Sequence, residues 1–217
     1  MKHSKTRKIG LIGYGELGRQ IELLLFAKFG PGLMISHFDD VKFKQKETNS
    51  YSFESYKDEK FKDIEFYVCL GYKQLTKKLE IINELNELKR KLPVFIHHSS
   101  YVSESASVLE GTIIYPMCNI DKNVTIGKGT LINNSVTLSH DNVIGDCCYI
   151  SPGVITSGNV HIGFNTFVGA SATFSNGVTI GDRCIIGIGS SVTRDIDSEK
   201  SAIGNPIKIL KKQLRLL

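Results

Sequence analysis

The sequence predicts two domains: an α/β domain over residues 1–98 and a left-handed parallel β-helix over residues 99–217. Three observations support this prediction. In the second half a large apolar residue recurs at every sixth position without an insertion, with one exception. In the first half short apolar runs alternate with helix-like segments. The first of these runs ends in a glycine-rich motif, Gly13-Tyr14-Gly15-Glu16-Leu17-Gly18.

The six-residue repeat runs from Val102 to Val192 and covers sixteen positions, of which only Thr156 is not a large apolar residue. Four residues after each of these positions, the side chain is mostly small or β-branched. A parallel β-helix of triangular cross-section uses six residues per side, so three repeats close one coil. The aliphatic side chains then point inward and stack in columns, and the small residues fit the corners. The repeat therefore predicts about five coils.

The first half shows the alternation that is typical of a parallel sheet with helical crossovers. Short apolar runs bounded by Gly, Pro or Asp indicate the strands, and Leu, Ile and Lys at helical spacing indicate the helices. The expected strands are Lys8–Ile12, Leu33–Phe38, Phe66–Leu70 and Pro93–Ile96, and the expected helices are Gln20–Phe29 and Tyr72–Lys91.

The motif Gly13-x-Gly15-x-x-Gly18 follows a strand, and Asp39-Asp40 ends the next strand, as in dinucleotide-binding folds. Such a turn can place a phosphate at a helix N-terminus, where free N–H groups favour anions. An NAD oxidoreductase is the standard inference, but a domain of about 95 residues is only half a full dinucleotide fold. A nucleotide-linked ligand is therefore favoured. A purely structural glycine turn and a solvated turn at Asp39-Asp40 remain the alternatives.

His140 is the strongest candidate for a catalytic base. It follows the inward-pointing Leu138 by two positions, so its side chain is expected on the solvent side of the coil. An imidazole has an unperturbed pKa of about 6.5, which suits proton transfer near neutral pH. The adjacent Asp141 could orient the ring and stabilise the imidazolium. The alternatives are a surface histidine without a role and an aspartate that hydrogen-bonds its own turn.

Two other chemistries are disfavoured by spacing. His161 follows His140 by 21 positions and no third histidine lies in the repeat, so no metal site is expected. The adjacent pair Cys147-Cys148 could suggest a thiol nucleophile. Cys148, however, holds the same small corner position as Cys118 and Cys184, so packing explains it better.

The composition excludes several further classes. The chain has 217 residues, of which 41% are hydrophobic and 23% charged, and a net charge of +5. No apolar run approaches about 18 residues, so no membrane span is expected. The five cysteines form no Cys-x-x-Cys pair and no secretion signal precedes them, which indicates a reducing, cytoplasmic location. The basic residues are spread along the chain without a nucleic-acid-binding motif, so no nucleic-acid partner is expected.

The glycine motif Gly13–Gly18 and the strand end Phe38-Asp39-Asp40, together with three segments of the second half, carry a resemblance to a known family. The three segments are the repeat unit Ile126-Gly127-Lys128-Gly129-Thr130, the block Ser139-His140-Asp141-Asn142-Val143-Ile144-Gly145, and the closing segment Ala202-Ile203-Gly204-Asn205-Pro206-Ile207-Lys208. With a small Rossmann-like domain in front, the chain resembles the hexapeptide-repeat sugar acyltransferases that build bacterial surface glycans. These include N-acetyltransferases of nucleotide-linked 4-amino-4,6-dideoxyhexoses and O-acetyltransferases of sialic acid. The resemblance covers Ile9 to about Leu210.

The resemblance implies direct transfer of an acetyl group from acetyl-CoA to the C4 amine of the sugar, by a cytoplasmic homotrimer. His140 would act as the general base with Asp141 as its partner, and the Gly158 N–H would stabilise the oxyanion. O-acetylation of sialic acid or another sugar is the alternative, and a non-catalytic trimeric scaffold is a second one. No metal is required.

The resemblance also implies two sets of ligand contacts. Acetyl-CoA would lie in a groove between two β-helices of the trimer. Tyr149 stands where related enzymes often carry a second histidine. The residues implied for acetyl-CoA are Tyr149, Gly158, Gly169, Ala170, Gly187 and Ile188. Those implied for the nucleotide-linked sugar are Gly13, Tyr14, Gly15, Asp39, Asp40, Gly71 and Tyr72.

Overall fold

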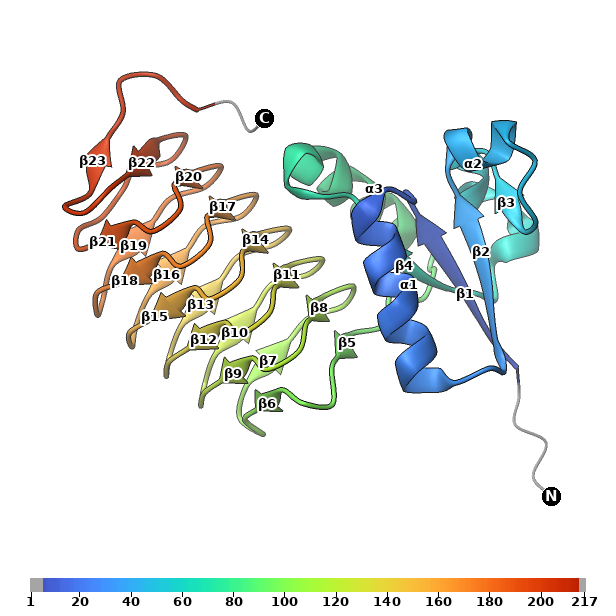
Figure 1. Cartoon of the computed structure of the whole chain (residues 1–217), viewed down its shortest axis with the longest axis horizontal. Helices are drawn as coiled ribbons and strands as arrows, with labels where there is room; N and C mark the ends of the chain where they lie inside the picture. Colours follow the sequence, from blue (N-terminus) through green and yellow to red (C-terminus); the bar gives the residue numbers. More distant parts are fainter. Residues whose placement is uncertain (1–5, 215–217) are drawn as a thin grey trace. The chain divides into compact units, whose positions relative to one another are not determined.

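The computed structural model describes residues 6–214, which form two compact units (Figure 1). The first unit contains the chain up to Gly71 together with Glu80–Pro93, and the second contains Tyr72–Leu79 and the chain from Val94 onward. The first unit is an α/β structure and the second is a parallel β-helix. The predicted fold class is confirmed.

A four-stranded parallel sheet forms the centre of the first unit, in the order β3-β2-β1-β4. The strands are β1 Arg7–Ile12, β2 Leu33–Phe38, β3 Ser50–Tyr51 and β4 Glu65–Val68. β2 and β4 flank β1, so the strand order reverses beside β1, as in one half of a doubly wound fold. Ligands of such sheets bind at the carboxyl ends of the strands on either side of this reversal.

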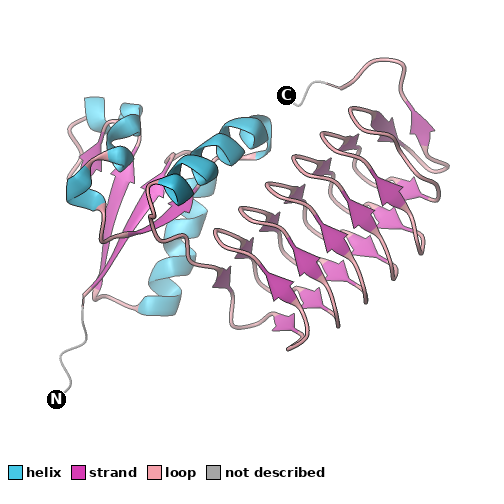
Figure 2. Ribbon diagram, turned by 180° about the vertical axis from the view of Figure 1, so that it is seen from behind, coloured by secondary structure: helices cyan, strands magenta, loops and turns pink. Residues whose placement is uncertain are grey.

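The helices within residues 6–214 are α1 Glu16–Phe29, α2 Asp40–Lys44 and α3 Leu75–Glu87, with short 3₁₀ turns at Phe53–Lys57, Glu59–Phe61 and Tyr72–Gln74 (Figure 2). α1 begins four residues before the expected start, directly after Gly15, and buries Ile21 and Leu25. The boundary between the two units falls inside α3. Among the described residues, no helix is long and apolar enough to cross a membrane.

The expected strand at Pro93–Ile96 does form, as β5 Phe95–Ile96, but its assignment to the first domain is wrong. β5 pairs with a β-helix strand, and the Phe95 N–H donates to the Thr112 carbonyl at 2.9 Å. Ile96 precedes Ile114 by 18 residues and Val102 by six, so it is the first member of the aliphatic series. The series therefore begins one repeat of six residues before Val102.

The β-helix consists of three parallel sheets, one on each side of the triangle (Figures 1 and 2). Residues 18 apart pair in register, as Ile132 does with Ile114 and Ile150. One sheet holds β5, β8 Ile113–Ile114, β11 Leu131–Ile132, β14 Tyr149–Ile150, β17 Phe167–Val168, β20 Ile185–Ile186, β22 Ser201–Ile203 and the antiparallel β23 Lys208–Ile209. The second holds β6 Tyr101–Val102, β9 Asn119–Ile120, β12 Thr137–Leu138, β15 Ile155–Thr156, β18 Thr173–Phe174 and β21 Ser191–Val192. The third holds β7 Ser107–Val108, β10 Thr125–Ile126, β13 Val143–Ile144, β16 His161–Ile162 and β19 Thr179–Ile180.

The interior of the β-helix is a continuous apolar core made by the aliphatic series. Each buried Ile, Leu or Val contributes about 1.5–3 kcal/mol relative to an exposed side chain. One corner of the triangle turns through a left-handed backbone residue in successive coils. The residues there are Asn123, Asp141, Asn159 and Gly177, with φ of 57°, 60°, 58° and 76°. Asn, Asp and Gly tolerate this conformation best, so the corner explains why these residue types recur every 18 positions.

Candidate active site

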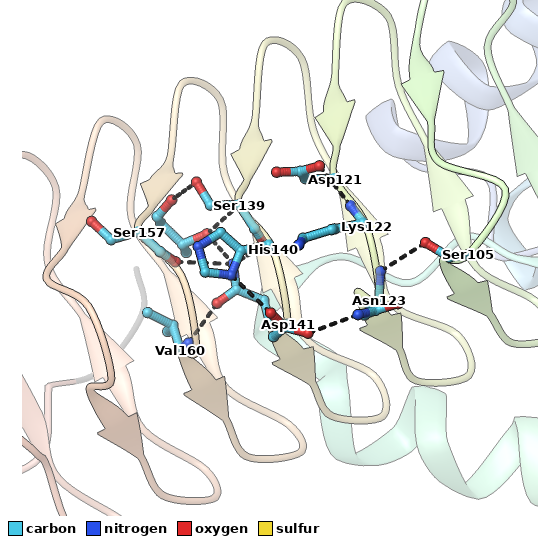
Figure 3. A network of polar contacts seen from close by, with 11 residues as sticks. Ser105, Asp121, Lys122, Asn123, Ser139, His140, Asp141, Ser157 and Val160 are labelled. Atoms are coloured by element: carbon cyan, nitrogen blue, oxygen red, sulfur yellow. Dashed lines mark hydrogen bonds and ion pairs between the residues drawn. The ribbon is translucent and has the colours of Figure 1, made fainter.

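His140 lies in the turn after β12, at the corner where successive coils stack their turns (Figure 3). Lys122 precedes it by one coil of 18 residues and Gly158 follows it by one coil. The side chain of His140 is 44% exposed, so it is accessible as the sequence predicts. The rigid stack of paired strands on either side fixes the backbone of this turn.

Asp141 holds the ring of His140. Its Oδ2 lies 2.8 Å from His140 Nδ1, and its Oδ1 accepts a hydrogen bond of 2.9 Å from Asn123 Nδ2 (Figure 3). The Asn123 amide, followed by His140, lowers the pKa of the Asp141 carboxyl below its usual range. An ionised carboxylate only accepts hydrogen bonds, so Nδ1 of His140 carries the hydrogen. Nε2 is then the basic nitrogen, free to accept a proton.

Gly158 lies directly against the imidazole. A Cβ added at Gly158 would be 2.3 Å from His140 Cε1 and 2.5 Å from Nε2, so no side chain fits at this position beside the ring. The Gly158 N–H has no hydrogen-bond partner among residues 6–214. An available backbone donor beside a base is the arrangement that an acyl donor requires for its developing oxyanion.

Four other residues predicted to contact acetyl-CoA lie at another corner of the β-helix. Gly169 and Ala170 follow β17, and Gly187 and Ile188 occupy the same place one coil later, after β20. Ile188 is 70% exposed. Gly158 instead follows β15, which belongs to a different sheet. A single chain therefore does not bring Gly158 together with these four residues.

Tyr149 and Tyr72, predicted for different ligands, meet within the second unit. Their ring centroids lie 5.5 Å apart, and the ring centroid of Tyr72 lies 5.1 Å from that of Phe167. Asn133 Nδ2 donates to the Tyr149 hydroxyl at 3.3 Å, and burial raises the pKa of Tyr149. The sequence reasoning missed Asn133. Its signal is positional, because Asn133 occupies the place where later coils of the same sheet have Gly169.

In the first unit the glycine motif has three distinct roles. Gly13 adopts φ +83°, which disfavours a side chain, and a Cβ there would lie 2.8 Å from Leu70 in the loop after β4. A Cβ at Gly18 would lie 2.7 Å from the Gly13 carbonyl, so Gly18 permits close packing of α1. Gly15 caps α1 without a side-chain contact, and the space beside it is open. Open space at a helix N-terminus is what a phosphate needs to approach the backbone.

The two aspartates after β2 are engaged by backbone N–H groups. Asp39 Oδ2 accepts from Tyr14 N at 2.9 Å, and its Oδ1 accepts from the first turn of α2. Asp40 Oδ1 accepts from Phe53 N at 2.9 Å. Asp39 thus joins the loop after β1 to the loop after β2 and brings Tyr14 beside it. Gly71 follows β4 and has open space beside it.

A polar cluster that the sequence did not reveal supports the same loop. The Tyr14 hydroxyl donates to Glu22, and His37 Nε2 lies 2.9 Å from the other carboxylate oxygen of Glu22. The ring centroids of Tyr14 and His37 lie 4.0 Å apart. Burial and the Glu22 carboxylate raise the pKa of Tyr14. Glu22 lies two turns into α1, so only the folded structure shows that it reaches Tyr14.

The cysteines are buried, as the packing interpretation predicts. Burial raises the pKa of Cys147 to about 11 and that of Cys148 to about 12, so neither is a thiolate at neutral pH. Cys148 Sγ instead donates to the Gly163 carbonyl at 3.0 Å. Within residues 6–214, no three His, Cys, Asp or Glu side chains form a group that could hold a metal ion.

Comparison with known proteins supports the fold and the enzyme class. Residues 159–194 match the family model "Bacterial transferase hexapeptide (six repeats)". The acetyltransferase domain of PglB from Neisseria gonorrhoeae FA1090 is 25% identical, with a TM-score of 0.82 over 94% of this chain and 100% of that chain. This chain is an acyltransferase whose β-helix carries hexapeptide repeats.

Two further structures place ligands in relatives of this acyltransferase. PglB in complex with acetyl coenzyme A is 24% identical, with a TM-score of 0.77 over 95% of this chain and all of that chain. A single-residue variant of perosamine N-acetyltransferase from Caulobacter crescentus, in complex with CoA and GDP-perosamine, is 25% identical. Its TM-score is 0.84 over 94% of this chain and 97% of that chain.

Proposed function

We propose that this acyltransferase transfers an acetyl group from acetyl-CoA to the C4 amine of a nucleotide-linked 4-amino-4,6-dideoxyhexose. The observation that carries the proposal is the stack of Asn123, Asp141 and His140 against the bare backbone of Gly158. It joins an oriented base to an available N–H donor, which are the two groups that direct acyl transfer requires.

The proposed chemistry assigns one role to each of these groups. Acetyl-CoA supplies the acetyl group as an activated thioester. His140 Nε2 accepts a proton from the sugar amine as that amine attacks the thioester carbonyl. The C–S bond of the thioester then breaks, and the imidazolium returns the proton to sulfur, so that CoA leaves as the free thiol. Asp141 remains ionised and stabilises the imidazolium through Nδ1. The Gly158 N–H donates to the oxygen on which negative charge develops.

The acceptor is inferred from the first unit and from the relatives. The open N-terminus of α1 at Gly15 suits the phosphates of a nucleotide-linked sugar. One relative carries CoA and GDP-perosamine, and its name describes N-acetylation of an amino sugar. We propose by the same reasoning that the product enters surface-glycan synthesis in the cytoplasm of a bacterium.

We further propose that the enzyme works as a homotrimer. Gly158 lies at one corner of the β-helix, whereas Gly169, Ala170, Gly187 and Ile188 line another. A groove between two neighbouring β-helices would face the His140 corner of one subunit toward the Ile188 corner of the next. Each acetyl-CoA would then contact two subunits, and the exposed Ile188 would be covered.

One experiment tests acceptor and donor together. The purified protein is incubated with acetyl-CoA and with GDP-, UDP- and dTDP-linked 4-amino-4,6-dideoxyhexoses, and the products are analysed by mass spectrometry. We expect a mass gain of one acetyl group on one of these sugars and none on the matching 4-hydroxy sugar. Acetylation of free sialic acid instead would favour the O-acetyltransferase alternative and contradict the proposal.

A further inference from the structure

Asn142 and Thr156 are the exceptions to an otherwise regular interior. Thr156 is the one residue of the aliphatic series that is not a large apolar residue, and it is fully buried. Asn142 is also fully buried, at a corner position where the neighbouring coils carry Val124, Val160 and Val178. The two exceptions lie in consecutive coils, at the turns that carry His140 and Gly158.

A buried polar corner residue elsewhere in the β-helix makes two hydrogen bonds between coils. Thr130 Oγ1 donates to the Gly145 carbonyl at 2.8 Å and accepts from Cys148 N at 3.0 Å. Asn142 makes both equivalent contacts. Its Nδ2 donates to the Ser157 carbonyl at 3.1 Å, and its Oδ1 accepts from Val160 N at 2.6 Å. These contacts alone would need only a threonine.

Asn142 makes two more contacts, and both lie at the His140 turn. Its Nδ2 lies 2.6 Å from the Ser139 carbonyl and 2.7 Å from Thr156 Oγ1. Thr156 also binds the His140 turn directly: its Oγ1 accepts a hydrogen bond from Ser139 N at 3.3 Å, and its carbonyl accepts one from Ser139 Oγ at 2.7 Å. Figure 3 shows Ser139 and Ser157 on either side of this network. Ser139 directly precedes His140, and Ser157 directly precedes Gly158.

We propose that Asn142 and Thr156 are positioning residues that fix the turn of His140 relative to the turn of Gly158. The inference rests on the proposed function, because it assumes that His140 is the base. The imidazole lies so close to Gly158 that a small shift between the coils would change the distance from Nε2 to the Gly158 N–H. A displacement of about 1 Å between catalytic groups can lower a rate about 100-fold. A hydrogen-bonded buried pair restricts such a shift more than apolar contacts do, because hydrogen bonds are directional.

The test replaces the pair by the side chains of the neighbouring coils. In the double variant Asn142→Val/Thr156→Val, the interior matches that of other coils, and removing both partners leaves no unpaired polar side chain. We expect an unchanged or higher Tm, a kcat lower by about 10-fold to 100-fold, and KM values for both substrates within about twofold. Thr156→Ser retains the hydroxyl and should restore most of kcat when compared with Thr156→Val.

A matched control and a second readout separate positioning from general stability. Thr112→Val removes a buried corner hydroxyl that donates to the Gly127 carbonyl, far from His140 in sequence, and should leave kcat unchanged. Hydrogen–deuterium exchange of segments 137–141 and 155–160 should be faster in the double variant than in the wild type. This exchange measurement does not depend on activity.

The outcomes distinguish the two proposals. If the wild type acetylates no sugar, the proposed function fails, whatever the exchange data show. If the wild type is active and the double variant keeps its kcat and its exchange rates, the positioning inference is overturned while the proposed function stands. A kcat that falls only in proportion to a lowered Tm would also overturn it, because a merely structural role predicts that relation.

Discussion

In the β-helix every eighteenth residue occupies an equivalent place, whereas no repeat relates the functional residues of the first unit. Asn123, Asp141, Asn159 and Gly177 share one turn conformation, and a departure from the local pattern, such as His140 or Asn142, is visible against its neighbours. In the first unit Tyr14, Glu22 and His37 come together only through folding. A repetitive scaffold thus makes unusual residues visible in the sequence, whereas their roles follow from the contacts of the folded chain.

The difference also concerns how each region tolerates change. For each residue near His140, the coils before and after it have a side chain at the equivalent position. A variant can therefore carry the side chain of a neighbouring coil. The loops of the first unit offer no such reference, because Asp39, Tyr14 and the glycines each make a different contact. Substitutions in the β-helix should therefore separate activity from stability cleanly, and those in the first unit less so.

The largest expected effect is that of His140→Ala in the β-helix. Loss of a general base typically lowers a rate about 100-fold to 10,000-fold. The side chain is 44% exposed and, among residues 6–214, it hydrogen-bonds only to Asp141, so Tm should change little. Steady-state kinetics and thermal unfolding check both points. Full turnover by a folded variant would show that another group accepts the proton.

Gly158→Ala should come next, with a loss of about 100-fold in kcat. The new Cβ would lie 2.3 Å from His140 Cε1, so the ring must turn away from its position beside Asp141. Asn176→Ala, at the same corner one coil later, is the control and should retain activity. If Gly158→Ala kept the wild-type kcat, the close contact between ring and backbone would have no role in transfer.

Smaller effects are expected at the glycine motif of the first unit, where one substitution should lower stability and another should lower the affinity for the sugar. Gly18→Ala places a Cβ 2.7 Å from the Gly13 carbonyl and should destabilise the fold by about 1–3 kcal/mol. Gly15→Ala meets open space, so stability should be retained, while the affinity for the nucleotide sugar falls about tenfold, or 1.4 kcal/mol. Chemical denaturation and titration calorimetry separate the two. Equal sugar affinity in Gly15→Ala would place the phosphates elsewhere.

The sequence predicts most of the β-helix, because the six-residue repeat corresponds directly to one side of each triangular coil. The place of Phe95–Ile96 differs from the prediction, because Ile96 extends the apolar series one repeat before Val102. One of the three sheets consequently has more strands than the predicted five coils supply. The base and its aspartate also follow from register. The roles of Asn142 and Asn133 do not, since a buried amide is recognised only by its partners. In the first unit, β3 has two residues and carries no periodic signal.

The smallest expected effect is a dependence of stability on pH at the His140 corner. The Asn123 amide is the main cause of the lowered pKa of Asp141. A carboxyl group whose pKa is lowered in the folded state stabilises the fold at pH values above its unfolded-state pKa, about 3.9. This contribution is lost as pH falls through the folded-state pKa.

Asn123→Gly retains the left-handed turn, as Gly177 does in the same column, but removes the amide. We expect a slightly lower Tm at pH 6–7, well above the unfolded-state carboxyl pKa of about 3.9, and a difference from wild type that narrows as pH falls below that unfolded-state value. Asn159→Gly, in the same column, controls for backbone effects and should show no such pH dependence. A difference that stayed constant across this pH range would mean that the amide stabilises the turn without acting through the charge of Asp141.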